Sequence, residues 1–299
     1  LKEGDKVAVI SPSALPTRTQ ADATIEGLKK WGYVPVEGKY VCTEGRTVED
    51  CREDLEWALN DPEIKAIFCV RGGYASTEVL DIMSLDTIAS AQKPIIGYSD
   101  ISAYHSAWTS AGLPSIHASM SAAFTELSEE CVEVQKAIMQ GEIPSYKCAG
   151  SVYDKQGSTE GVLIGGNLTV YMCVLGTDYD SSALEEPYIL LLEDVEAGFL
   201  GTHSSLTVLK NAGVLDNAAG IIFGEWTDFD TVSDYDGRSR GGKFTSAYDM
   251  IYRQFIKDLD IPVAFGFPAG HGKNNYPLLM GSRISLNVAE DSFTITPAD

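Results

Sequence analysis

The chain has 299 residues, 44% of them hydrophobic and 22% charged, which is the balance of an ordinary globular protein and predicts roughly two domains. Its 43 acidic residues outnumber 22 lysines and arginines, so the formal net charge of −21 argues against nucleic acid or an anionic membrane as a partner. No run approaches the ~20 apolar residues of a membrane-spanning helix, and the charged residues 1–6 predict no signal peptide, so we expect a cytoplasmic protein.

The N-terminal half alternates apolar strands with helices. Strands are expected at 6–11, 33–37, 64–70 and 94–97, and helices near 20–31, 48–60, 76–83, 101–111 and 131–139. Continuous apolar strands separated by helices predict a mainly parallel sheet with helices on both faces, a three-layer α/β domain. In such folds functional groups gather beyond the carboxyl ends of the strands.

The second half is richer in strands. Residues 141–160 are polar and loop-like, so we interpret them as a linker between an N-terminal α/β domain over 1–140 and a smaller, β-rich C-terminal domain over 161–299. Strands are expected at 161–168, 188–193, 220–224, 262–266, 283–288 and 292–296, and helices at 204–211 and 245–259. The acidic residues Asp228, Asp230, Asp234 and Asp236 lack the spacing of a calcium loop and predict a solvated acidic loop.

The cysteines and histidines predict no metal site and no cofactor. None of the six cysteines forms a CxxC pair, and the four histidines are scattered along the chain. Reduced and mostly buried thiols are therefore expected, although the even number leaves disulfides open.

The segment 97–101, Gly-Tyr-Ser-Asp-Ile, has the features of a nucleophile elbow. A buried strand ends at Gly97, turns tightly and enters a helix, which would lift the Ser99 hydroxyl above the sheet. The backbone N–H of Asp100 would then face a developing oxyanion. The usual elbow has a glycine two residues after the serine, where this chain has Ile101. The alternative is that Ser99 or Asp100 only caps the helix.

Three further segments at strand ends carry candidate groups. The turn 71–74, Arg-Gly-Gly-Tyr, could supply a second oxyanion donor or simply turn the chain. Glu193 and Asp194 end an apolar strand, where a carboxylate could orient a histidine or merely meet solvent. His271, between two glycines, could be a general base or an exposed loop histidine.

His203 and His105 are alternative bases. Both lie within or beside helical patterns, where surface or satisfied core positions are commoner for histidine.

Six motifs occur in the same order as in the LD-carboxypeptidase family of serine peptidases, which the chain resembles over nearly its whole length. They are Gly-Asp-Lys-Val-Ala-Val-Ile-Ser-Pro-Ser (4–13), Arg-Gly-Gly-Tyr (71–74), Gly-Tyr-Ser-Asp-Ile-Ser (97–102), Gly-Gly-Asn-Leu (165–168), Leu-Leu-Glu-Asp-Val (191–195) and Gly-His-Gly (270–272). The family includes cytoplasmic muramoyltetrapeptide carboxypeptidases and microcin C immunity peptidases. The resemblance implies an N-terminal α/β domain, a smaller β-rich C-terminal domain, an active site between them and a homodimer.

The resemblance also implies a role for each matching residue. Ser99 would be the nucleophile, Glu193 the orienting carboxylate and His271 the general base. The backbone amides of Gly73 and Asp100 would form the oxyanion hole.

For the substrate, the resemblance leaves two small peptide classes. Murein-recycling members release a terminal D-alanine from a murein tetrapeptide, and immunity members hydrolyse aminoacyl or peptidyl nucleotides. Immunity members carry a longer stretch here, with an aromatic residue that stacks on a nucleotide base; in this chain the stretch 152–161 is short and has no tryptophan, which favours the murein substrate. The segment 196–206 lacks the arginine usual in murein members. A binding protein that has lost catalysis is the remaining alternative, which the intact Ser99, Glu193 and His271 count against.

Overall fold

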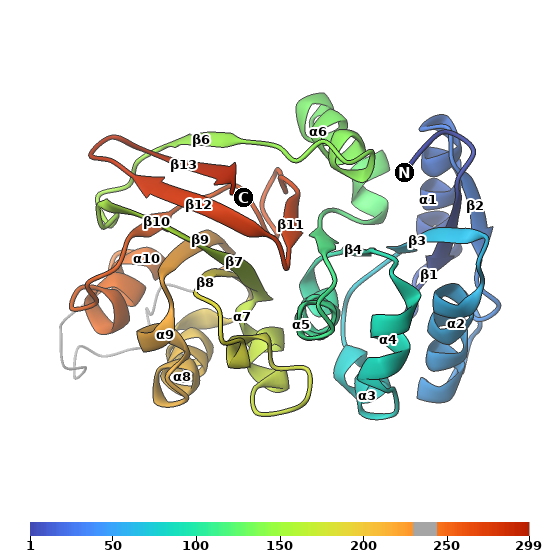
Figure 1. Cartoon of the computed structure of the whole chain (residues 1–299), viewed down its shortest axis with the longest axis horizontal. Helices are drawn as coiled ribbons and strands as arrows, with labels where there is room; N and C mark the ends of the chain where they lie inside the picture. Colours follow the sequence, from blue (N-terminus) through green and yellow to red (C-terminus); the bar gives the residue numbers. More distant parts are fainter. Residues whose placement is uncertain (230–243, 299) are drawn as a thin grey trace.

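The computed structural model describes residues 1–229 and 244–298, which form two sheets side by side (Figure 1). Within the described residues no helix is both long and apolar enough to cross a membrane. Three members of the predicted acidic loop, Asp230, Asp234 and Asp236, lie outside the described residues.

The first sheet has the strand order β11-β5-β4-β3-β1-β2. Its strands are β1 (Lys6–Ile10), β2 (Val34–Glu37), β3 (Ile64–Cys69), β4 (Ile95–Gly97), β5 (Ser115–His117) and β11 (Leu278–Met280). Its helices are α1 (Arg18–Lys30), α2 (Val48–Asn60), α3 (Ser76–Asp81), α4 (Leu85–Ala91), α5 (Ser102–Ser110) and α6 (Glu129–Met139). All neighbouring strands pair in parallel except β11 with β5, so the predicted mainly parallel α/β sheet is confirmed.

Alternate residues of β1 show why its apolar run is continuous. Val7 and Val9 pack with α1 and α6 on one face of the sheet, and Ala8 and Ile10 pack with α2 to α5 on the other. All four side chains are fully buried. A strand covered on both faces has no solvent side, so polar and apolar residues do not alternate along it.

The second sheet has the order β10-β9-β8-β7-β12-β13-β6. Its strands are β6 (Tyr146–Ala149), β7 (Gly157–Asn167), β8 (Tyr188–Val195), β9 (Gly220–Thr227), β10 (Val263–Phe265), β12 (Arg283–Val288) and β13 (Ser292–Pro297). Its helices are α7 (Leu168–Tyr171), α8 (Gly198–Asn211), α9 (Val214–Asn217) and α10 (Ala247–Ile251), the last continued by a π-helical turn over Tyr252–Ile256. Strands β7 to β10 are parallel, and β12, β13 and β6 extend the sheet in antiparallel pairs.

Several elements differ from the sequence interpretation. The short elements α4, β5, α7, α9 and β11 were not predicted, and β6 and α8 show why such differences arise. Residues Tyr146–Ala149 form the edge strand β6 within the segment read as loop-like, and their side chains alternate between half-buried and exposed. An edge strand with one solvent face needs few apolar residues, which explains the weak signal. Helix α8 begins at Gly198, six residues before the predicted start. Its first turn contains Gly198 and Gly201, and glycine has a low helix propensity, so the sequence carries no helical signal there.

Strand β11 belongs to the first sheet, although in the sequence it lies between β10 and β12 of the second sheet. The chain leaves the second sheet after β10 and returns to the first sheet, where Leu278 pairs with His117 and Met280 pairs with Ser115. This strand lies within the range 161–299, so the second half of the sequence completes the sheet of the first half. The predicted boundaries 1–140, 141–160 and 161–299 stay a prediction.

Helix α5 lies between the sheets and packs on β7 (Figure 1). The backbone N–H of Asn167 donates to Ser102 Oγ at 2.8 Å. Gly166 has φ of +134°, and a Cβ built on it would overlap the Ser102 side chain. The close approach of the two sheets therefore depends on the absence of a side chain at Gly166.

Replacing Gly166 with alanine is expected to lower the free energy of unfolding by on the order of 3 kcal/mol, because overpacking and backbone strain add at this site. The matched control is Gly176→Ala, since Gly176 also has positive φ (+73°) but no atom lies within 4 Å of its Cβ position. The control is expected to cost only about 1–2 kcal/mol of backbone strain. Equal losses in urea unfolding would contradict the close contact with Ser102.

Candidate active site

Three residues from distant parts of the chain meet between the two sheets. Ser99 follows β4, Glu193 lies near the end of β8, and His271 lies in the loop between β10 and β11. His271 Nε2 lies 3.0 Å from Ser99 Oγ, and its Nδ1 lies 2.8 Å from Glu193 Oε2. The three side chains singled out in the sequence thus form one hydrogen-bonded line.

The backbone at Ser99 is strained in the way that an elbow requires. Ser99 has φ of +64°, in the left-handed region that non-glycine residues seldom adopt. Ile101 is fully buried, and a Cβ on Gly97 would lie 2.9 Å from its side chain. The glycine two residues before the serine therefore provides the room that a glycine two residues after it usually provides.

The alternative that these residues only cap a helix is wrong. Neither the 3₁₀ turn η1 (Ser99–Ile101) nor α5 has a side-chain cap hydrogen bond. The Asp100 carboxylate instead accepts hydrogen bonds from the Ser13 hydroxyl and from the backbone N–H of Ser76, the first residue of α3, so neither bond is made within η1 or α5.

Hydrogen-bond chemistry fixes the imidazole tautomer of His271. A carboxylate only accepts, so Nδ1 carries the hydrogen that it donates to Glu193. Nε2 is then free to accept the Ser99 hydroxyl hydrogen. This tautomer is the one in which a histidine acts as a general base toward a serine.

The charges around His271 favour its protonated form. Burial lowers the pKa of His271, but the hydrogen bond and negative charge of Glu193, with smaller contributions from Asp194 and Glu196, outweigh burial and raise it above its usual value. Glu193 is fully buried; burial raises the pKa of its carboxyl, and the hydrogen bond from His271 opposes that rise. A buried carboxylate beside the imidazole is suited to stabilising an imidazolium.

Asp194 has a separate task. Its Oδ1 accepts from Asn167 Nδ2 at 3.1 Å, and its Oδ2 accepts from Thr169 Oγ1 at 2.8 Å. Successive residues of a strand point to opposite faces, so only one of the adjacent carboxylates can reach His271. The structure brings Glu193 to the histidine and directs Asp194 to the start of α7.

The two alternative histidines lie elsewhere. His105 is fully buried, its Nε2 lies 2.9 Å from the Gly97 carbonyl oxygen, and burial lowers its pKa to about 4. His203 lies on α8, where its ring packs against Phe199 and Phe255. Geometry therefore leaves His271 as the histidine beside Ser99.

The glycine turn after β3 lies against the turn that carries Ser99. A Cβ on Gly72 would lie 3.0 Å from Ser99 Cβ and 3.3 Å from the Asp100 nitrogen. In the part of the chain that the structure describes, the Gly73 N–H donates to no acceptor. Two backbone amides, of Gly73 and Asp100, thus lie in segments that border Ser99.

Two residues at this site were missed in the sequence. The Tyr98 ring packs on the His271 ring with centroids 4.9 Å apart, and its signal was its position directly before Ser99. Glu225 lies where the apolar run of β9 ends, and a Cβ on Gly272 would overlap its carboxylate. The strand-end rule that selected Glu193 would also have selected Glu225.

Comparison with known proteins gives matches to both halves of the chain. Residues 7–118 match the family model of the LD-carboxypeptidase N-terminal domain, and residues 160–286 match that of the LD-carboxypeptidase C-terminal domain. A murein tetrapeptide carboxypeptidase from Pseudomonas aeruginosa is 29% identical over 290 residues, covering 90% of this chain and 89% of the relative.

Solved structures share the fold over the full length. A muramoyltetrapeptide carboxypeptidase from Oxalobacter formigenes superposes with a TM-score of 0.86 at 24% identity, covering 98% of this chain and 99% of that one. The microcin C7 self immunity protein MccF superposes with a TM-score of 0.82 at 21% identity, covering 100% of this chain and 97% of that one. The two-sheet α/β architecture is thus common to both kinds of protein.

Proposed function

Because this chain belongs to the LD-carboxypeptidase family of peptidases, we propose that it is a serine carboxypeptidase that releases the terminal D-alanine of murein tetrapeptides. The observation that carries this proposal is the line of contacts from Ser99 through His271 to Glu193. Its distances are those of a nucleophile, its base and the group that orients the base.

Each step of the proposed reaction uses a named atom. Ser99 Oγ attacks the carbonyl carbon of the bond to be cut while His271 Nε2 takes the hydroxyl proton. Glu193 stabilises the resulting imidazolium. His271 then gives the proton to the nitrogen of D-alanine, which leaves, and the peptide stays on Ser99 as an ester. Water, deprotonated by His271, releases the peptide and restores the serine.

The negative charge that develops on the carbonyl oxygen needs donors beside Ser99. We assign this role to the backbone N–H groups of Gly73 and Asp100. The closeness of Gly72 to Ser99 and the lack of an acceptor for the Gly73 N–H within the described residues support the assignment. Losing one such donor typically lowers a rate by about 10²- to 10³-fold.

The murein substrate is inferred from the relatives and from the chain itself. The full-length relative from Pseudomonas aeruginosa is named for murein tetrapeptide, and the stretch 152–161 has no tryptophan that could stack on a nucleotide base. The proposed substrate is therefore a tetrapeptide whose last residue is D-alanine.

The experiment measures the release of free D-alanine from a purified murein tetrapeptide, with both products detected by chromatography. We expect release from the D-alanine peptide and none from a matched peptide that ends in L-alanine. A folded protein that leaves the tetrapeptide intact but hydrolyses an acyl-sulfamoyl adenylate would reject the murein substrate and keep the serine peptidase chemistry.

A further inference from the structure

The carboxylate of Asp100 joins three loops at the carboxyl edge of the first sheet. Its Oδ2 accepts the Ser76 N–H at 3.0 Å and the hydroxyl hydrogen of Ser13 in a close hydrogen bond. Ser13 follows β1, Ser76 is the first residue of α3 directly after the loop that follows β3, and Asp100 itself follows β4. Asp100 is 5% exposed, so water does not compete strongly for this oxygen.

The loop between β3 and α3, residues 71–75, is held against the loop that carries Ser13. The Ala14 N–H donates to the Gly72 carbonyl oxygen at 3.3 Å. Gly73 has φ of +121°, and a Cβ on it would lie 2.5 Å from Ala14 Cβ, so the two loops touch at Gly73. Ser13 Oγ also lies 3.1 Å from the Tyr74 carbonyl oxygen, a longer contact than the one to Asp100.

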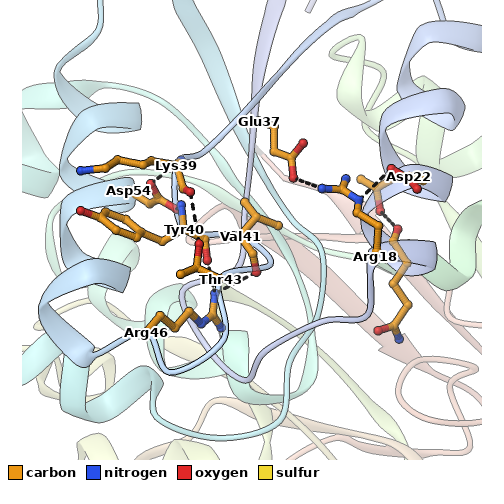
Figure 2. Close-up of polar contacts among 11 residues, drawn as sticks. Arg18, Asp22, Glu37, Lys39, Tyr40, Val41, Thr43, Arg46 and Asp54 are labelled. Atoms are coloured by element: carbon orange, nitrogen blue, oxygen red, sulfur yellow. Dashed lines mark hydrogen bonds and ion pairs between the residues drawn. The ribbon is translucent and has the colours of Figure 1, made fainter.

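Ser13 is fixed from its other side by an arginine that has no role in the proposed reaction. Arg46 donates from Nη2 to the Ser13 carbonyl oxygen at 2.6 Å, and from Nη1 to the carbonyl oxygens of Tyr40 and Val41 at 3.4 and 3.3 Å. Arg46, Tyr40 and Val41 all lie in the loop between β2 and α2 (Figure 2), where Asp54 also accepts the Tyr40 N–H at 2.9 Å. The position of Ser13 is therefore set by the β2–α2 loop as well as by Asp100.

We propose that Asp100 acts as a positioning residue whose carboxylate, through Ser13 and through Ser76 at the start of α3, holds the loop 71–75 so that the Gly73 N–H faces the same point as the Asp100 N–H. This inference rests on the proposed function, in which those two amides stabilise the oxyanion. A negative carboxylate near a developing oxyanion opposes the reaction by its charge. Its contribution therefore lies in the hydrogen bonds that it accepts, which an uncharged amide oxygen can also accept.

Asp100→Ala is expected to lower kcat for D-alanine release by about 10²-fold, the typical effect of losing one oxyanion donor, with KM within about twofold. Asp100→Asn is expected to recover to within about tenfold of the wild type, because its amide oxygen accepts the same hydrogen bonds more weakly. Ser13→Ala is expected to lower kcat by roughly tenfold. The double variant is expected to be no slower than Asp100→Ala, because both residues act through one set of contacts.

Ser128→Ala is the matched control. Ser128 also accepts one backbone hydrogen bond through its Oγ, from Cys131 at the start of α6. It is expected to lose stability without changing kcat. Unchanged kcat in Asp100→Ala, or losses that add in the double variant, would overturn the proposal.

Hydrogen–deuterium exchange of residues 71–76 provides a second measurement that does not depend on the reaction. Exchange is expected to be faster than in the wild type in Asp100→Ala and close to the wild type in Asp100→Asn. Equal exchange in all three proteins would overturn the positioning role. A wild type that releases no D-alanine and does not react with a fluorophosphonate would instead reject the proposed function, whatever the exchange shows.

Discussion

Replacing Ser99 with alanine is expected to lower the rate of D-alanine release by about 10⁴- to 10⁶-fold, the range found when a catalytic serine is removed from enzymes of this chemistry. The variant lacks the oxygen that lies 3.0 Å from His271 Nε2, so no acyl-enzyme can form. Alanine at φ of +64° costs about as much as serine at the same φ, so the free energy of unfolding should change by less than ~1 kcal/mol. Both quantities are measured on the same preparation, by product chromatography and by urea unfolding.

Ser90→Ala is the control for this prediction. Ser90 lies exposed on α4, where its hydroxyl donates to the Asp86 carbonyl oxygen within the helix. Its replacement should leave the rate unchanged, and a fluorophosphonate should label this control and the wild type at Ser99. A Ser99→Ala protein that keeps more than about one hundredth of the wild-type rate would show that another group is the nucleophile.

Replacing Glu193 with glutamine is expected to lower kcat by about 10⁴-fold, because the amide no longer holds the tautomer that leaves Nε2 free. It should also move the acid limb of the pH profile of kcat/KM to lower pH. In the wild type the pKa of His271 is raised, so the imidazole is protonated and inactive at low pH and becomes a base only as the pH rises through that raised value. Removing the negative charge lowers the pKa of His271 and extends the active form to more acidic solution.

The control for the pH effect is Glu196→Gln. Glu196 also contributes negative charge at His271, but it is a smaller cause of the raised pKa and makes no hydrogen bond to the imidazole. It should move the acid limb slightly in the same direction and keep kcat within about threefold. If the acid limb of Glu193→Gln coincided with that of the wild type, Glu193 would not be the charge that sets the pKa of His271.

Much of the fold could be predicted because its strands carry strong local signals. The buried parallel strands are continuous apolar runs, and their order alternates with helices along the chain. Strand β6 has a solvent face, and β11 has only three residues, so neither produces a pattern that stands out from its surroundings. The position of a short strand or an edge strand is determined by the strand with which it pairs. That partner is distant in the sequence, so the residues of the strand alone do not reveal it.

The site was predictable to the extent that its residues follow strands. Ser99, Glu193 and His271 each lie beyond or at the end of a strand, but spacing alone did not separate Glu193 from Asp194. The family resemblance made that choice, and the structure brings Glu193 and not Asp194 to His271. The side-chain contacts of Asp100 could not be predicted, because Ser13 lies 87 positions and Ser76 lies 24 positions away in the sequence.

The placement of β11 limits how this chain can be divided. β5 would have an open edge without β11, and an unpaired edge strand invites association with other chains. A fragment that ends at residue 140 would therefore expose the edge of β5 to association with other chains. The remaining fragment would contain the three residues of β11 without the strand with which they pair. His271 lies seven residues before β11, so the pairing of β11 with β5 also connects His271 to the sheet that carries Ser99. The two halves therefore cannot be exchanged independently. If one half is replaced by that of a relative, residues 266–280 must come from the same protein as the N-terminal half.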